Sequence, residues 1–314
     1  MMPNRYSHRQ TINPNNSVKY IDLSENVSNK KEKLSSKIGR IVNSMMAFMI
    51  AYLGIMFFLY LSTALMGKLF GFDAQIYYYG VKFQLGKHKW TNFNVFWIWS
   101  FGTLFTFFLG IAFSFLFRYF KDRLVLGNLV SLWGMVIAFS IAAAQTVLPC
   151  LGGYEGSAYY TNLSIVSNYL SLPVPVLYII CIVALVILAF FSTNTSKSFL
   201  SFSYSFSKVN KRDRKRKYYL ETVFVPYMLA SVLLLAFFNE NYRYTNFIHQ
   251  NVVYLGVTGF SLLVSFLVIN ISDMRSDDVL RYKNLQQVSA GLFVILMMLL
   301  VFLAVTWQGF YMPF

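Results

Sequence analysis

The side chains that could do chemistry inside the apolar part of this chain are amides and phenols. The long apolar stretches hold Asn128, Gln145, Tyr178 and Tyr227, but no Asp, Lys, Arg or His, and their single acid is Glu221 at one end. Proton relays, voltage sensors and many ion-coupled carriers need ionisable groups at depth in the membrane. The four residues are therefore candidates for lining a cavity for a neutral solute. Hydrogen bonds between packed helices are the alternative explanation.

The sequence offers no familiar catalytic or metal-binding set. The three histidines, His8, His88 and His249, lie outside the apolar stretches, and no His-Glu-x-x-His sequence is present to bind zinc. The same stretches lack the aspartate pair of an intramembrane aspartyl protease. Cys150 and Cys181 are expected at different depths, which disfavours a disulfide. We therefore expect no cofactor, metal or catalytic residue, and lean toward a protein that is not an enzyme.

The densest charge in the chain is a basic cluster between residues 208 and 217. It ends directly at an apolar stretch that begins at Leu220. Nucleic-acid readout would need a folded module with a recognition helix or stacking aromatics. A cluster beside a membrane span instead suits anionic headgroups, at about 1 kcal/mol per basic residue. We predict lipid contact and no nucleic acid, with a cytoplasmic protein partner as the alternative. The predicted contact residues are Lys208, Lys211, Arg212, Arg214, Lys215, Arg216 and Lys217.

The elements that must position these residues are membrane-spanning helices. Of the 314 residues, 57% are hydrophobic and only 12% are charged, about half the charged fraction of soluble domains. A helix needs about 20 apolar residues to cross a bilayer core. The stretches that meet or approach this length are roughly Val42–Met66, Val95–Phe117, Leu124–Leu148, Pro173–Phe191, Leu220–Phe238, Val252–Ile271 and Val288–Trp307. The predicted fold is an all-α polytopic transmembrane helix bundle of about seven spans (residues 42–314), preceded by a polar N-terminal segment (residues 1–41).

Charge in the connections predicts the orientation of the bundle. Residues 1–41, 118–123, 192–219 and 272–287 would share one side of the membrane, and they carry 22 of the 27 basic residues. The positive-inside rule then places the N-terminus in the cytoplasm and the C-terminus outside. Usage rich in Asn, Lys, Ile, Tyr and Phe hints at a bacterial genome of low GC content, so the predicted location is the bacterial inner membrane.

Shorter segments lie beside the spans. Residues 27–41 combine helical spacing with lysines, which predicts an amphipathic helix at the membrane surface that runs into the first span. The alternation within residues 74–90 predicts a small hairpin. In residues 198–207 the alternation of apolar residues and Ser favours an aromatic-rich loop on the headgroups over a short strand. Helical spacing within residues 150–172 predicts a surface helix that braces the bundle, with a re-entrant helix as the alternative. Pro226 is expected to kink the fifth span and to leave a carbonyl that a neighbour must satisfy.

Several blocks of the sequence resemble known proteins. The blocks LSTALMGKLFG, WSFGTLF, SFSYSFSKVN and LPVPVLY resemble multi-pass membrane proteins of Bacteroidota that carry no biochemical assignment. Residues 58–83 are similar to the site-2-protease class of metalloproteases, whose zinc helix runs on through a small-residue, Lys and Phe-Gly tail into a short hairpin. In that alignment the zinc histidines fall on Leu59 and Thr63, and the catalytic glutamate falls on Tyr60. None can do the chemistry, so the resemblance implies an inactive relative that serves as a binding protein.

These observations leave two main classes of function. The slightly preferred class is a non-enzymatic scaffold, accessory subunit or assembly factor with a membrane-protein partner. The other is a carrier or channel for a neutral or lipidic solute, which would use Asn128, Gln145 and tyrosines with a hinge at Pro226. The inactive site-2-protease-like binding protein is a further alternative.

Overall fold

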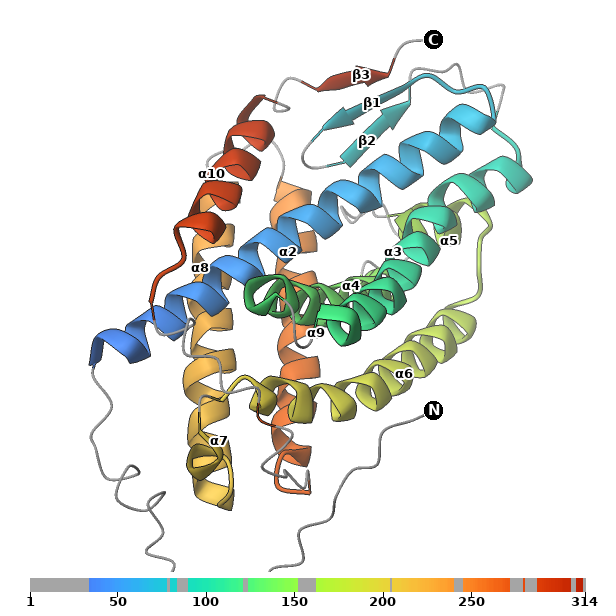
Figure 1. Cartoon of the computed structure of the whole chain (residues 1–314). Helices are drawn as coiled ribbons and strands as arrows, with labels where there is room; N and C mark the ends of the chain where they lie inside the picture. Colours follow the sequence, from blue (N-terminus) through green and yellow to red (C-terminus); the bar gives the residue numbers. More distant parts are fainter. Residues whose placement is uncertain are drawn as a thin grey trace, which may run out of the picture. The chain divides into compact units, whose positions relative to one another are not determined.

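A bundle of helices with a small sheet at one end makes up the described part of the chain (Figure 1). The structure is a computed structural model that describes residues 34–77, 80–83, 90–120, 124–151, 162–203, 205–239, 245–271, 279, 287–305 and 309–312. The helices are α2 (Leu34–Leu69), α3 (Asn92–Phe120), α4 (Val125–Leu151), α5 (Asn162–Tyr169), α6 (Val174–Ser201), α7 (Arg212–Tyr219), α8 (Val225–Asn239), α9 (Thr245–Val268) and α10 (Ala290–Val305). A π-helical turn at Leu220–Phe224 joins α7 to α8, so that they form one continuous helix.

Six of the helices in the described ranges are long and apolar enough to cross a membrane. They are α2, α3, α4, α6, the continuous helix from α7 to α8, and the part of α9 from His249, while α10 is apolar but shorter. Each predicted span coincides with one of these helices. The all-α polytopic helix bundle is therefore confirmed, and the protein is a multi-pass membrane protein.

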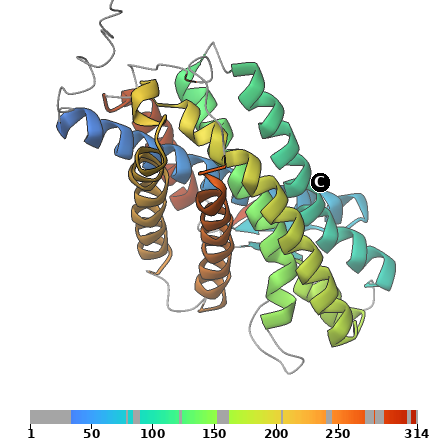
Figure 2. The same cartoon turned by 90° about the horizontal axis from the view of Figure 1, so that it is seen from below.

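The centre of the bundle is built on α2 and α4. Their apolar windows are 72% and 78% buried, compared with 28% for α3 and 17% for α6. Trp133 of α4 and Tyr52 of α2 are among the largest side chains that are fully buried. Helices α8 and α9 run beside each other along one side (Figures 1 and 2). Lipid is the solvent of the outer helices, so exposed apolar side chains on α3 and α6 are expected there.

Pro226 leaves a carbonyl without its helical donor, and a serine of another helix satisfies it. A proline has no N–H, so the carbonyl of Thr222, one turn earlier, loses its helical partner. Ser44 Oγ on α2 donates to this carbonyl at 2.8 Å, and Trp133 Nε1 on α4 donates to Ser44 Oγ at 3.1 Å. The prediction that a neighbour satisfies the freed carbonyl is confirmed. The irregularity itself takes the form of the π-helical turn that precedes Pro226.

Replacing Ser44 with Ala should cost about 1 kcal/mol of unfolding free energy, because the Thr222 carbonyl loses its donor. In a Pro226→Ala background the cost should be smaller, since residue 226 then offers an N–H of its own. Denaturant titration in mixed micelles of the wild type, both single variants and the double variant measures this coupling. An identical Ser44→Ala cost in both backgrounds would show that the serine does not compensate for the proline.

The predicted hairpin is present, and a third strand joins it. Strands β1 (Ala74–Tyr77) and β2 (Gly80–Phe83) pair antiparallel, and β3 (Phe310–Met312) pairs antiparallel with the other edge of β1. Because β1 and β3 share a sheet, they lie on the same side of the membrane, and the chain between them must cross an even number of times. The five longer helices that follow β1 therefore require α10 to be the next crossing, which supports seven spans.

The prediction for residues 198–207 is wrong. Residues 198–201 complete α6, and Phe206–Lys208 form a 3₁₀ turn. Phe202 is buried and contacts Phe117 of α3 with ring centroids 6.3 Å apart, so the segment neither pairs as a strand nor lies on the headgroups. Several of its serines bond to nearby backbone carbonyls instead, as Ser201 Oγ does to Ser198 O at 2.7 Å. Serine side chains can be buried in the core because their hydroxyl groups are hydrogen-bonded in this way.

The structure tests two further predictions in part, for residues 150–172 and for residues 27–41. A helix does form within residues 150–172, as α5, whose Asn162 Nδ2 donates to Thr63 Oγ1 of α2 at 2.9 Å. Tyr159, part of the predicted pattern, lies outside the described residues. Helix α2 begins at Leu34 and continues without a break through residues 41 and 42 into the first span. Residues 27–33 of the predicted amphipathic helix also lie outside the described ranges.

The two cysteines are free thiols that meet each other. The Cys150 thiol donates to the carbonyl of Thr146 at 3.7 Å, and Cys181 is near enough to interact with it, so the expectation of different depths is wrong. Cys150 lies at the end of α4, whereas Cys181 lies seven residues into α6.

Candidate functional site

The structure does not bring the four predicted cavity-lining residues together. Tyr178 is 52% exposed on the outer face of α6, whereas Asn128 and Gln145 are fully buried in α4. Tyr227 is buried on α8 and donates to the carbonyl of Leu255 in α9 at 2.8 Å. Neither amide atom of Asn128 has a hydrogen-bond partner among the described residues. Of the four residues, Gln145 and Tyr227 both donate a hydrogen bond to helix α9.

A buried polar cluster does form around Gln145, from α2, α4 and α9. The side-chain amides of Gln145 and Gln250 both donate to the hydroxyl of Tyr254, and Tyr52 OH donates to Asn251 Oδ1 at 2.5 Å. All five side chains are at most 7% exposed. These neutral groups can exchange hydrogen bonds but offer no strong acid or base. The cluster fastens α9 to the two central helices.

Sequence reasoning found Gln145 but missed its partners. Gln250 and Asn251 lie just outside the predicted sixth span, which was expected to begin at Val252. Gln250 and Tyr254 are four residues apart, the spacing that places two side chains on one face of a helix. That spacing, with Asn251 beside it, was the available signal for a polar face on α9.

The positions that the site-2-protease resemblance singles out are used for packing. Leu59, Tyr60 and Thr63 are buried in α2. Thr63 Oγ1 donates to the carbonyl of Leu59 at 2.9 Å and accepts from Asn162 of α5. A Cβ atom at Gly102 of α3 would lie 2.3 Å from Thr63 Oγ1, so α3 also approaches closely. Within the described ranges, no group of three His, Cys, Asp or Glu side chains could hold a metal ion.

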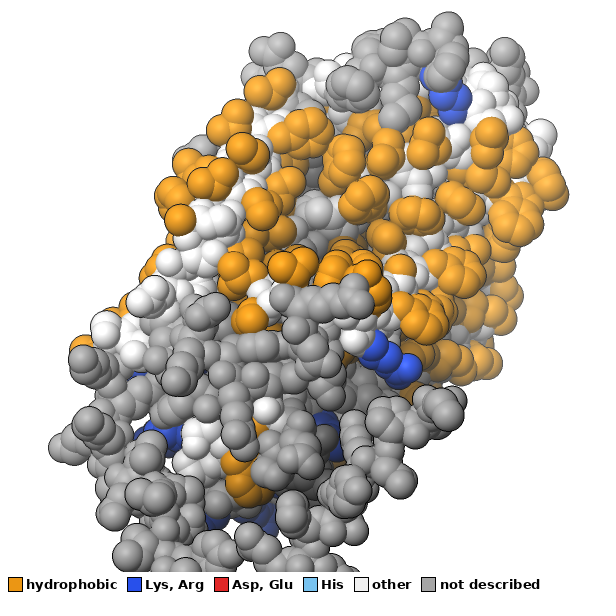
Figure 3. All heavy atoms as spheres, viewed as in Figure 1, with side chains coloured by type: hydrophobic (Ala, Val, Ile, Leu, Met, Phe, Trp, Pro, Cys, Tyr) orange, Lys and Arg blue, Asp and Glu red, His pale blue; other side chains and the backbone are white. Residues whose placement is uncertain are grey.

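An apolar groove with a volume of about 860 Å³ runs along α2 and α3. Its lining is aromatic and aliphatic apart from Ser62 and two charged residues, Lys68 and Asp73. The lining residues are Phe58, Leu61, Ser62, Leu65, Met66, Lys68, Leu69, Gly71, Phe72, Asp73, Phe101 and Phe105. Apolar side chains cover much of the bundle face in Figure 3, and Lys and Arg appear at its margins. Because several of its lining residues are exposed apolar side chains, the groove opens to the hydrocarbon of the membrane.

Aromatic rings gather where α2 ends and the hairpin begins. Phe72 packs against Trp90 with ring centroids 4.3 Å apart and the rings tilted by 33°. Phe83 contacts Trp90 at 5.7 Å and Trp99 at 5.4 Å. Trp and Tyr are enriched at the level of the headgroups. This end of the groove therefore lies at the membrane surface.

The basic cluster divides between two faces of α7. Lys211, Arg212, Arg214 and Lys217 are exposed, whereas Lys215 is only 7% exposed. Lys208, just before α7, is half-buried. The Arg216 guanidinium donates to the side-chain oxygen of Asn270 at 2.9 and 3.1 Å and lies over the ring of Phe266. The first four residues are available for headgroups, while Lys215 and Arg216 pack against the protein.

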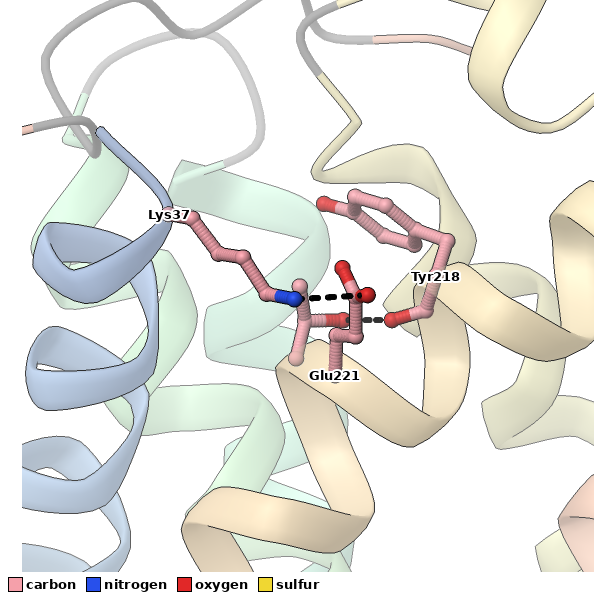
Figure 4. A network of polar contacts seen from close by, with 4 residues as sticks. Lys37, Tyr218 and Glu221 are labelled. Atoms are coloured by element: carbon pink, nitrogen blue, oxygen red, sulfur yellow. Dashed lines mark hydrogen bonds and ion pairs between the residues drawn. The ribbon is translucent and has the colours of Figure 1, made fainter. Parts of the chain in front are cut away.

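Glu221 forms an ion pair with helix α2. It lies in the π-helical turn inside the continuous helix from α7 to α8. Lys37 Nζ of α2 binds Glu221 Oε1 at 2.8 Å, next to Tyr218, whose carbonyl accepts from Thr222 Oγ1 (Figure 4). The Lys37 and Glu221 side chains are 38% and 23% exposed. Screening by solvent therefore limits the pair to about 1 kcal/mol or less.

The comparisons with known proteins do not identify a family for this chain. The resemblances to Bacteroidota membrane proteins and to the site-2-protease class therefore stay predictions. No protein-family model, curated protein or solved structure matches the chain.

Proposed function

We propose that the chain is a non-enzymatic protein of the bacterial inner membrane that binds a lipid-like molecule in the groove between α2 and α3. The observation that carries this proposal is the groove itself. Its volume of about 860 Å³ lies within the 300–1,000 Å³ typical of ligand sites. Its walls are almost entirely apolar, as a site for an acyl or isoprenoid chain must be. This proposal develops the lipidic form of the carrier or channel, which the sequence left as the alternative to the slightly preferred scaffold, and the groove favours it over the scaffold.

A small polar solute fits the structure less well. The polar cluster around Gln145 is buried, and its hydrogen bonds already join the helices to one another. Tyr178 faces away from the bundle. A lipid, in contrast, would reach the groove from the bilayer without passing through the packed core. Helix α3, which forms one wall, is among the less buried spans.

The proposed orientation places the groove at the outer side of the membrane. The N-terminal and other basic connections carry 22 of the 27 Lys and Arg, which supports a cytoplasmic N-terminus. The chain then crosses once in α2 before it forms β1. The end of the groove beside the hairpin would accordingly face the outer leaflet, and the exposed cations of α7 would face the inner leaflet.

Lipid carried through purification tests the proposal. We expect native mass spectrometry of the wild type in mild detergent to show bound lipid, and Leu65→Trp, which fills the groove, to lose it. Val186→Trp is the matched control, because Val186 is 63% exposed on α6 and does not line the groove. A wild type free of lipid, or equal lipid on both variants, would refute the proposal. A protein that co-purifies in place of lipid would favour the scaffold.

A further inference from the structure

Two charges of opposite sign stand at one end of the groove. Lys68 lies in the last turn of α2, and Asp73 lies immediately before β1. Both line the groove, and the other lining residues are uncharged. A ligand that fills the groove therefore meets a cation and a carboxylate at one end and only apolar walls along the remainder.

The end of α2 brings the two charges to the same place. The N–H of Gly71 bonds to the carbonyl of Lys68 at 2.8 Å, and the N–H of Phe72 bonds to the carbonyl of Gly67 at 3.1 Å. This pair of bonds is a Schellman motif, which requires a left-handed residue, and Gly71 supplies it with φ of 76°. The motif turns the chain back, so that Asp73 lines the same groove as Lys68.

The charged end lies at headgroup depth and the other end lies in hydrocarbon. The rings of Phe72, Trp90 and Trp99 mark the membrane surface beside Lys68 and Asp73. Phe58 lies ten residues before Lys68 on α2, about 15 Å further along the helix and toward the hydrocarbon. This polarity matches an amphiphile that stands upright in one leaflet. A transmembrane helix of a partner protein would present a uniformly apolar side, which does not match the charged end of the groove.

We propose that the groove binds a phospholipid whose headgroup carries a phosphate and a primary ammonium, as in phosphatidylethanolamine. The inference rests on the lipid-binding function proposed above. The Lys68 ammonium would bind the phosphate, because lysine serves as a point charge for phosphate oxygens. The Asp73 carboxylate would accept hydrogen bonds from the headgroup ammonium.

The pairing of charges distinguishes among headgroups. Lys68 and Asp73 together carry no net charge, which matches a zwitterionic headgroup. A phosphatidylglycerol headgroup is anionic and would bring no cation to Asp73. A phosphatidylcholine headgroup is zwitterionic, but its trimethylated ammonium has no N–H to donate to the carboxylate. Phosphatidylethanolamine therefore offers a group of complementary charge to each of the two side chains.

Native mass spectrometry with the three lipids, added at equal concentration with identical acyl chains, tests the inference on the full-length protein. We expect the wild type to bind phosphatidylethanolamine at least about fivefold more tightly than the other two lipids, since charge-assisted bonds exceed neutral ones. Asp73→Asn should abolish this preference, and Lys68→Gln should weaken binding of all three lipids. Lys82→Gln is the control, because Lys82 is exposed on β2 and outside the groove lining.

The outcomes separate the two proposals. Equal binding of the three lipids by the wild type, or an unchanged preference in Asp73→Asn, would overturn the headgroup assignment and leave the lipid groove in place. If wild-type protein and the Leu65→Trp variant bind all lipids equally, both proposals fail. Size-exclusion chromatography checks that each variant is folded, and both substitutions at the charged end keep the side chain polar and similar in size.

Discussion

Replacing Trp133 with Ala is expected to lower the free energy of unfolding by about 3–5 kcal/mol, the largest effect we anticipate for a single substitution. The indole is fully buried in α4. It makes edge-on contacts with Phe48 of α2 and Phe199 of α6, each with ring centroids 5.0 Å apart. The substitution would leave a cavity among three helices. It would also remove the donor to Ser44, which in turn supports the Thr222 carbonyl.

Two companion variants identify the origin of the loss. Trp133→Phe keeps much of the ring packing but removes the N–H, so its cost should be clearly smaller than that of the alanine variant. Trp97→Ala removes the same residue type from α3, where the side chain is 36% exposed, and should change stability little. Denaturant titration in mixed micelles gives the unfolding free energies. A Trp133→Ala cost below about 1 kcal/mol would contradict a packed junction at this position.

Gly67→Val should detach the hairpin from α2 and cost about 3 kcal/mol or more, at the upper end of overpacking effects. A Cβ atom at Gly67 would lie 2.1 Å from the nearest ring carbon of Phe83. This ring cannot easily move, because Phe72, Trp90 and Trp99 surround it with centroid distances of 6.2, 5.7 and 5.4 Å. The backbone of β2 must then move instead. Since Phe72 also lines the groove, the variant should carry less lipid as well.

Gly54→Ala is the matched control on the same helix. A Cβ atom at Gly54 meets nothing within 4 Å, and alanine favours a helix over glycine by up to about 1 kcal/mol. We expect its thermal stability to equal or exceed that of the wild type. If the Gly54 and Gly67 variants melted at the same temperature, the close approach of Phe83 to α2 would not be a constraint on the fold.

The spans could be predicted because a bilayer requires long apolar helices. The hairpin could be predicted because apolar and polar residues alternate along its strands. Helix α5 followed from helical spacing in a loop. Strand β3 was not predictable, since three residues carry no periodic signal and their partner lies near the other end of the sequence. For residues 198–207 the period was misinterpreted, because serines that bond to their own backbone can occupy a buried helix end.

The candidate site was less accessible to sequence reasoning than the fold. Gln145 stood out as an amide in an apolar stretch, but its partner Tyr254 resembled any interfacial tyrosine. The groove has no polar signature along most of its length, because its walls are the same Phe and Leu side chains that face lipid elsewhere. Only the placement of α2 against α3 creates it. Lys68 and Asp73 were visible in the sequence, but the turn at Gly71 decides that they line the same groove.

The pairing of β1 with β3 has a consequence for biosynthesis. The two strands are separated by about 240 residues, so at 5–20 residues per second β1 emerges from the ribosome roughly 10–50 s before its partner. During that interval one edge of β1 presents unpaired N–H and C=O groups, which are open to association with other chains. The sheet can be completed only after α10 has been inserted. Its closure then ties α10 to the segment that follows α2 by main-chain hydrogen bonds between β1 and β3.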